Sequence, residues 1–283
     1  MKGQTPTKAY KNSEFLNCPA AREVRILTEF LEPLYRFRKR RISNTIVVFG
    51  SARVLPTVEA TKRLARIRRK IGKKGTRNLK LQEQLERAIE GLEMARYYDD
   101  AVQLTSMLTR WSKTLKQERR FVICSGGGPG IMEAANKGAA LAGGDSIGLN
   151  ISLPFEQKSN KYVTKDLRFE FHYFFMRKFW FLYLAKALVM FPGGFGTFDE
   201  LFEVLTLLQT KKVTKPLPVI LYGRSYWNEV LNLDALVRHN TISKRDLELI
   251  RFADTPQEAY THLRDELTKI FKSQNSMIPT VRT

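Results

Sequence analysis

The segment from Phe191 to Glu200 has the residue types that binding and cleaving a phosphate-bearing substrate would need. It holds three glycines and a threonine ahead of the glutamate: Gly193, Gly194, Gly196 and Thr197. Glycine allows positive φ and lets a ligand approach the backbone closely. A helix that begins here would direct free N–H groups and the positive end of its dipole at a phosphate. We therefore expect an anion-binding turn, with a catalytic carboxylate at Glu200 one turn into the helix.

Thr197 and Glu200 also fit a purely structural role. The spacing T-x-x-E is that of a capping box, in which Glu200 would only accept a hydrogen bond from the backbone. The glycines before it favour the ligand-binding interpretation, because a simple cap needs none of them. The patterns G-x-G-x-x-G and G-x-x-x-x-G-K-[ST] are not met by this segment, so a Rossmann oxidoreductase or a P-loop NTPase is not supported by its fingerprint.

Two more small-residue turns follow apolar runs that are typical of buried strands. Gly50 and Ser51 follow residues 45–49, at a strand's carboxyl end, where parallel sheets bind ligands. A second glycine-rich turn follows residues 121–124 and leads into a helix that carries Glu133; its glycines include Gly127, Gly128 and Gly130. This turn is a second candidate for anion binding, although such turns are also ordinary connections.

Arg177 and Lys178 lie within an apolar, aromatic-rich helical segment, residues 174–182. A buried charge is costly unless it meets a partner, so we expect at least one of the two to face an anion. The alternative is that both reach solvent with their stems packed on apolar neighbours. His172, just before this segment, could be catalytic, with a hydrogen-bonded structural role as the alternative.

These residues must be positioned by repeated strand–helix units, which predict an α/β fold. We expect a Rossmann-like, doubly wound parallel sheet with helices on both faces over residues 44–272. Residues 1–43 are interpreted as an N-terminal helical extension and residues 273–283 as a tail.

Residues 57–95 interrupt the alternation of strands and helices. Basic residues between 61 and 70 and an apolar stripe at Leu81, Leu85, Ile89 and Leu92 predict a helical hairpin, inserted ahead of a separate helix from Ala95 to Leu115. The stripe needs cover, from its own domain or from another subunit.

Charge, cysteine content and hydropathy limit the partners and the location expected for this protein. The net charge is +20, and residues 1–120 hold 28 Lys and Arg against 12 Asp and Glu. Such an excess suits nucleic acid or another polyanion, or it is only a solvated helical face. Cys18 and Cys124 offer neither a disulfide framework nor metal spacing, so we expect no metal and a cytoplasmic protein. No apolar run reaches membrane-spanning length, so no membrane partner is expected.

The motifs together resemble the LOG (LONELY GUY) family, whose members were once labelled lysine decarboxylases. The resemblance rests on Gly50-Ser51-Ala52-Arg53, the 126–132 segment GGGPGIM, Arg177-Lys178 and PGGFGTFDE, and it spans about residues 44–270 apart from the insertion. It implies hydrolysis of the N-glycosidic bond of a nucleoside 5′-monophosphate, such as a cytokinin riboside monophosphate, without a cofactor. It places the catalytic pair on Arg177 and Glu200, and phosphate contacts on the two glycine turns, 126–130 and 193–197. Glu133 and Glu203 fall at positions of polar substrate contacts, and Lys178 beside the catalytic arginine.

One departure from the family pattern bears on the substrate. Many plant-like members have Met-His-Glu-Arg-Lys where this chain has Phe174-Phe175-Met176-Arg177-Lys178, so the base and the cytokinin assignment stay open. Alternatives are an AMP-like nucleotide, a nucleotide- or molybdenum-cofactor-binding protein without hydrolysis, and an RNA-associated protein that uses the basic N-terminal third. The few aromatic residues among the bases weigh against nucleic acid. The apolar segments at 174–184 and 201–208 predict a homodimer or a higher homo-oligomer.

Overall fold

The computed structural model describes residues 6–74, 78–153 and 159–276. In this part of the chain the strands form one parallel, seven-stranded sheet in the order β4-β3-β2-β1-β5-β6-β7. The strands are β1 (Thr45–Phe49), β2 (Val122–Ser125), β3 (Ser146–Ile151), β4 (Arg168–Phe171), β5 (Ala185–Met190), β6 (Val219–Tyr222) and β7 (Ile250–Ala253). The fold class predicted from the sequence is confirmed.

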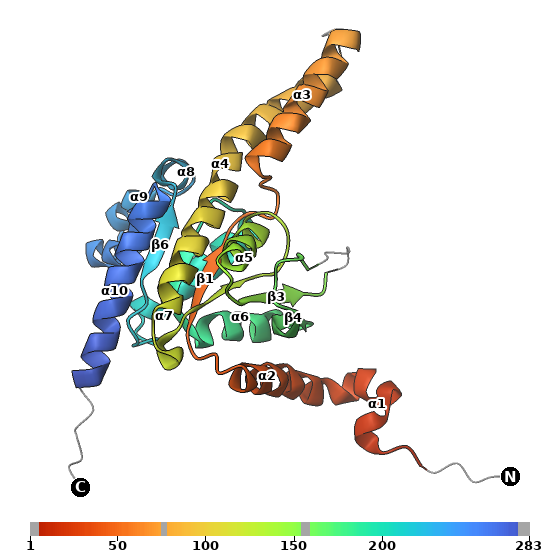
Figure 1. The fold of residues 1–283 in the computed structure, drawn as a ribbon, viewed down its shortest axis with the longest axis vertical. Helices are drawn as coiled ribbons and strands as arrows, with labels where there is room; N and C mark the ends of the chain where they lie inside the picture. The colour runs from red at the N-terminus through yellow and green to blue at the C-terminus, as the bar shows by residue number, and fades with distance from the viewer. Residues whose placement is uncertain (1–5, 75–77, 154–158, 277–283) are drawn as a thin grey trace, which may run out of the picture.

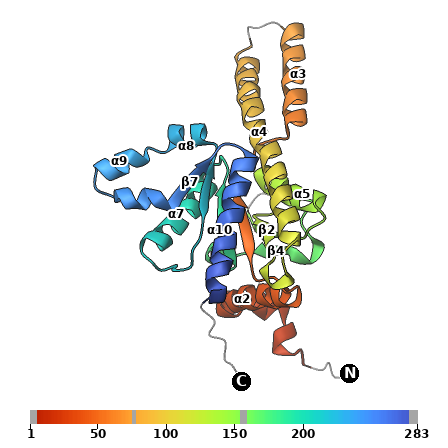
Figure 2. The same ribbon diagram turned by 60° about the vertical axis from the view of Figure 1, so that its left-hand side comes forward.

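Helices cover both faces of this sheet, as Figures 1 and 2 show. They are α1 (Ser13–Asn17), α2 (Arg22–Lys39), α3 (Thr57–Lys74), α4 (Leu79–Lys113), α5 (Ile131–Leu141), α6 (Phe174–Tyr183), α7 (Phe195–Gln209), α8 (Arg224–Val230), α9 (Leu233–Arg238) and α10 (Pro256–Ser276). No helix in the described ranges is long and apolar enough to cross a membrane.

Two hydrophobic cores lie on opposite faces of the sheet, because alternate strand residues point to opposite sides. Ile46 and Val48 face the core beneath α4, α5 and α10. Val47 and Phe49 face the other core, which α2, α6, α7 and α8 cover. Helices α5 and α7, which carry the two glycine turns at their N-termini, therefore lie on opposite faces of the sheet.

The N-terminal helical extension is packed firmly against the body of the domain. Helix α2 continues through the basic residues 36–39, and its Phe37 is buried against Phe169 and Trp180. A single aromatic side chain among five bases, residues 36–41, therefore anchors the helix to the core.

Helices α3 and α4 project from the body of the molecule (Figures 1 and 2). The expected separate helix from Ala95 was wrong, since α4 runs unbroken from Leu79 to Lys113 and supplies both the second arm and a core helix. The hairpin covers most of the predicted apolar stripe: Leu85 and Leu92 pack against Leu64 and Ile67 of α3. Leu81 is buried, whereas Ile89 remains exposed. Gly72, between the basic residues and the apolar stripe, lies inside α3, and residues 75–77 lie outside the described residues.

The C-terminal part of the fold ends in short elements and one long helix. Helices α8 and α9 are separated at Leu231 and Asn232, and Asn232 caps α9. Strand β7 is short and half-buried at the sheet edge. The last helix continues to Ser276, past the start of the tail predicted over 273–283, and the rest of that tail lies outside the described residues.

Candidate active site

The candidate site lies where the strand order reverses. Strands β1 and β5 are neighbours, and the connections that follow them run to opposite faces of the sheet. Ligands of open α/β sheets bind at such a point, outside the carboxyl ends of the strands. The Ser51 N–H donates to the Pro192 carbonyl at 2.9 Å, which holds the two strand ends together. A cavity of about 840 Å³ opens above them.

The turn between β5 and α7 lines this cavity with Gly193, Gly194, Gly196 and Thr197. Helix α7 begins at Phe195 with Gly194 as its N-cap, and the Thr197 N–H donates to the Gly194 carbonyl at 2.8 Å. Thr197 is therefore the third residue of the helix and not its cap, so the capping-box interpretation of Thr197 and Glu200 is wrong. The first N–H groups of α7 have no intrahelical acceptor and lie beside the cavity, an arrangement that suits an anion.

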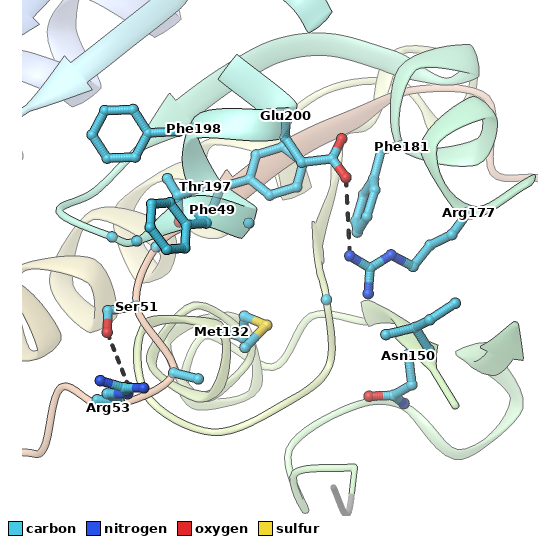
Figure 3. Close-up of a pocket in the computed structure, with 18 of the residues that line it drawn as sticks. Phe49, Ser51, Arg53, Met132, Asn150, Arg177, Phe181, Thr197, Phe198 and Glu200 are labelled. Atoms are coloured by element: carbon cyan, nitrogen blue, oxygen red, sulfur yellow. Dashed lines mark hydrogen bonds and ion pairs between the residues drawn. The ribbon is translucent and has the colours of Figure 1, made fainter. Parts of the chain in front are cut away.

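Glu200 and Arg177 face one another across the cavity wall (Figure 3). Their closest approach is 3.9 Å, between Glu200 Oε1 and Arg177 Nη2, and their side chains are only 5% and 16% exposed. Burial raises the pKa of Glu200 to about 7, and the nearby Arg177 and Lys178 oppose that rise only in part. Burial also lowers the pKa of Arg177. The carboxyl group is thus poised to exchange a proton near neutral pH, as general acids and bases are.

The Arg177 guanidinium is held by aromatic rings. It lies 5.3 Å from the ring centre of Phe174 and 5.4 Å from that of Phe181, within the range of cation–π attraction. Its Nε is buried without a hydrogen-bond partner in the described part of the chain. This orientation leaves the guanidinium directed at Glu200 and the cavity (Figure 3).

The Lys178 side chain points away from the cavity, unlike that of Arg177. Its Nζ lies 2.7 Å from Asp199 Oδ1 and 2.9 Å from Glu203 Oε2, so the three form an ion-pair cluster between α6 and α7. Neither Lys178 nor Glu203 lines the cavity. Their geometry fixes the spacing of the two helices that carry Arg177 and Glu200.

The second glycine turn contributes less to the cavity than its sequence suggests. Gly126 lines the cavity, whereas Gly127, Gly128 and Gly130 do not. The Asn160 amide donates to the carbonyls of Gly127 and Gly128 at 3.0 Å. Gly127 and Gly130 have positive φ, and a Cβ at Gly130 would overlap the backbone at Ser51 and Ala52. These glycines therefore serve a tight packing of backbone segments beneath the cavity floor.

Glu133 and His172 also lie apart from the cavity lining. Glu133 Oε1 accepts a hydrogen bond from the Tyr98 hydroxyl at 2.8 Å, which joins α5 to α4. The His172 side chain is exposed, and its backbone N–H donates to Glu29. Gly50 and Ser51, by contrast, both line the cavity.

Several lining residues were not singled out from the sequence. Asn150 stands at the carboxyl end of β3, where the rule that drew attention to Gly50 would also have found it. The Tyr226 hydroxyl donates to the Gly193 carbonyl at 2.6 Å and steadies the α7 turn from α8. Phe174, Phe181 and Phe198 add apolar surface to the lining and lie in the two segments that also carry Arg177 and Glu200. No local motif marks Tyr226, because tertiary packing alone brings it to the site.

Comparison with protein families finds one model, described as "Possible lysine decarboxylase", that matches residues 132–263. This segment includes Arg177, the α7 turn and Glu200. The match supports the LOG-like resemblance. No curated protein sequence matches the chain.

The solved structures that are similar to this chain include two at low sequence identity. One is the X-ray structure of TM1055, a structural genomics target, with a TM-score of 0.46 and 20% identity over 78% of this chain and 99% of that one. The other is titled as the molybdenum cofactor binding protein from the phototrophic bacterium Rippkaea orientalis, with a TM-score of 0.45 and 17% identity over 79% of this chain and 98% of that one.

Proposed function

We propose that this protein hydrolyses the N-glycosidic bond of a nucleoside 5′-monophosphate and releases the free base and ribose 5-phosphate. The observation that carries the proposal is the buried Arg177–Glu200 pair beside the glycine turn of α7. The pair, the glycine turn and several aromatic rings line one cavity of about 840 Å³. The LOG-like family match supports a nucleotide-processing enzyme.

Glu200 acts on the sugar in this proposal. Cleavage of the bond between C1′ and the base develops positive charge on the ribose ring, and a carboxylate within the cavity stabilises that charge. As water adds to C1′, Glu200 accepts its proton. A carboxyl group whose pKa is about 7 is basic enough to do so and is still largely ionised slightly above neutrality.

Arg177 orients the nucleotide and balances charge on the departing base. Its planar fork can donate two parallel hydrogen bonds, and the flanking rings of Phe174 and Phe181 restrict its orientation. The same rings and Phe198 offer an apolar surface against which a purine-like base can pack. The proton that the leaving base takes up balances the proton that water loses.

The 5′-phosphate is assigned to the N-terminus of α7. Gly194 and Gly196 line the cavity there, and a Cβ added at either would meet no atom within 4 Å. The space beside them is therefore open to a ligand. Binding energy at the phosphate, away from the reacting bond, can then position C1′ between Glu200 and the attacking water.

The test is to incubate the purified protein with a panel of nucleoside 5′-monophosphates, including AMP and cytokinin riboside monophosphates. Released base is followed by chromatography, with the matching nucleosides as controls that lack the phosphate. We expect base release from at least one monophosphate and little from its nucleoside. Tight binding of a nucleotide or of molybdenum cofactor with no base released from any monophosphate would contradict hydrolysis and favour a carrier. The same panel identifies the base.

A further inference from the structure

A second, smaller cavity of about 310 Å³ lies at the base of the α3–α4 hairpin. It shares Ser51, Arg53 and Met94 with the main cavity, so the two are contiguous at the carboxyl end of β1. Arg53 stands beside Ser51, on the side of the main cavity away from Arg177 (Figure 3). The second cavity thus extends the candidate site in the direction opposite to the catalytic pair.

Three arginines from three different segments line this second cavity. Arg53 comes from the loop after β1, Arg63 from α3 and Arg87 from α4. Within the described ranges none of them forms an ion pair, whereas Arg177 in the main site faces the carboxylate of Glu200. Glu90 is the acidic residue in the lining, so the cavity keeps an excess of positive charge. Guanidinium groups stay protonated at any relevant pH and match the geometry of phosphate oxygens.

The hairpin positions these arginines from a packed base. Arg87, Gly91 and Met94 follow one another at helical spacing on one face of α4 and line the cavity together. Buried contacts of Leu64 and Ile67 with Ala88 hold α3 against α4 and so fix Arg63 opposite Arg87. A Cβ at Gly91 would meet no atom within 4 Å. Glycine disfavours a helix interior, and here it leaves the cavity open.

We propose that this arginine cavity binds a second phosphate group, so that a nucleotide with two adjacent phosphates, such as a nucleoside 5′-diphosphate, binds more tightly than the monophosphate substrate. The orientation rests on the proposed function. With the sugar at Arg177 and Glu200 and the 5′-phosphate at the α7 turn, the next phosphate passes Ser51 toward Arg53, Arg63 and Arg87. The insertion that carries two of these arginines would then select this ligand.

The surrounding basic surface offers matched controls. Arg66 and Arg69 lie on the same helix as Arg63 and are also exposed, but they do not line the cavity. A diffuse attraction between a basic helix and any polyanion would depend on all of these charges alike. A built phosphate site depends only on the residues that line it. The double variant R63Q/R87Q and the control R66Q/R69Q remove the same charge from the hairpin and separate the two cases.

The experiment measures binding by calorimetry, because binding does not require turnover. AMP, ADP, and AMP with added inorganic phosphate are titrated into the wild type and both double variants at fixed ionic strength. We expect ADP to bind the wild type about tenfold more tightly than AMP, as charge-assisted hydrogen bonds to one further phosphate would allow. R63Q/R87Q should lose this preference and keep its AMP affinity, while R66Q/R69Q keeps both.

The other outcomes overturn the proposal. Equal affinity of the wild type for AMP and ADP would do so, as would equal losses of ADP preference in both double variants. A gain in AMP affinity on adding inorganic phosphate, lost only in R63Q/R87Q, would assign the cavity to a free anion and overturn the diphosphate. These results are independent of the proposed hydrolysis: ADP preference without base release would contradict the reaction alone, and base release without ADP preference would contradict the second phosphate alone.

Discussion

The Glu29 carboxylate of α2 accepts a hydrogen bond from the backbone N–H of His172 at 2.7 Å. It also accepts one from the N–H of Tyr173 at 3.3 Å, and the Trp180 indole donates to the Glu29 carbonyl at 2.9 Å. His172 and Tyr173 immediately precede α6, the helix that delivers Arg177. The N-terminal helix therefore positions a candidate catalytic residue without touching the cavity itself.

Substituting Glu29 should weaken this support. We expect Glu29→Ala to lower the free energy of unfolding by about 1–2 kcal/mol, because two backbone donors at the start of α6 lose a charged acceptor. Turnover should fall while the KM for the nucleotide changes less, since Arg177 becomes less well oriented. Denaturant unfolding and steady-state kinetics measure the two effects. Glu23→Ala, an exposed glutamate on the same helix, is the matched control, and an equal loss in both variants would contradict a positioning role.

Glu200→Gln keeps the shape of the side chain and removes its charge. Because Glu200 is not a cap of α7, we expect the variant to fold and bind nucleotide and to lose turnover by about 100-fold or more. In the wild type, the rate of base release should rise with pH through about 7, the pKa of Glu200, and then level off. Full activity of Glu200→Gln in the chromatographic assay would remove Glu200 from the mechanism.

The Glu200 carboxyl group should also make the free energy of unfolding depend on pH. Burial raises its pKa from 4.5 to about 7 on folding, so the folded state binds more protons than the unfolded state between these values. The contribution of Glu200 to stability is therefore present below pH 4.5 and is lost as the pH rises toward 7. Relative to wild type, Glu200→Gln should gain stability over this range, by at most about 3 kcal/mol. Thermal unfolding of both proteins at pH 5 and pH 8 checks the sign.

Arg177→Lys tests whether the planar fork matters. Lysine keeps the charge but lacks the paired donors and the stacking between Phe174 and Phe181. We expect a loss of turnover of about tenfold or more and weaker nucleotide binding, with Arg177→Ala more severe in both. Unchanged kinetics in both variants would show that Arg177 only packs against its aromatic neighbours.

Gly196 and Gly193 separate ligand binding from folding at the α7 turn. A Cβ at Gly196 meets open space, so Gly196→Ala should keep or raise stability, by about 0.5–1 kcal/mol, and weaken phosphate binding. At Gly193 a Cβ would lie 2.7 Å from Thr197 Cβ and 3.1 Å from Ser51 N, so Gly193→Ala should destabilise the turn itself. Calorimetry with AMP and thermal unfolding give both quantities. Unaltered AMP affinity in a stable Gly196→Ala would move the phosphate away from α7.

The sheet and the glycine turn before Glu200 could be predicted because both are local signals, whereas the pairing of Arg177 with Glu200 was implied by the family resemblance. Buried strands are continuous apolar runs, and three glycines mark the turn before Glu200. What the sequence could not predict depends on contacts between distant segments: the direction of Lys178 toward Asp199, the anchoring of α2 through Glu29, and the arginines that α3 and α4 bring to Arg53. The unbroken α4 was missed for a related reason, since its outer half pairs with α3 and its inner half with the sheet, which gives one helix two apolar patterns.

Assembly is the last prediction. Helix α6 leaves Phe175 and Tyr183 about half exposed, at 50% and 51%, and Leu27 and Leu31 of α2 are similarly open at 53% and 49%. The two helices are packed against each other through Phe30, and both present exposed apolar side chains near the segment that carries Arg177. Exposed patches of this kind are typical of protein interfaces.

We expect a homodimer of the 32.7-kDa chain in light scattering at micromolar concentration. Phe175→Glu should shift it to monomer, whereas Val58→Glu, on the exposed start of α3, should not. A wild-type monomer, or equal dissociation in both variants, would contradict an interface on this face.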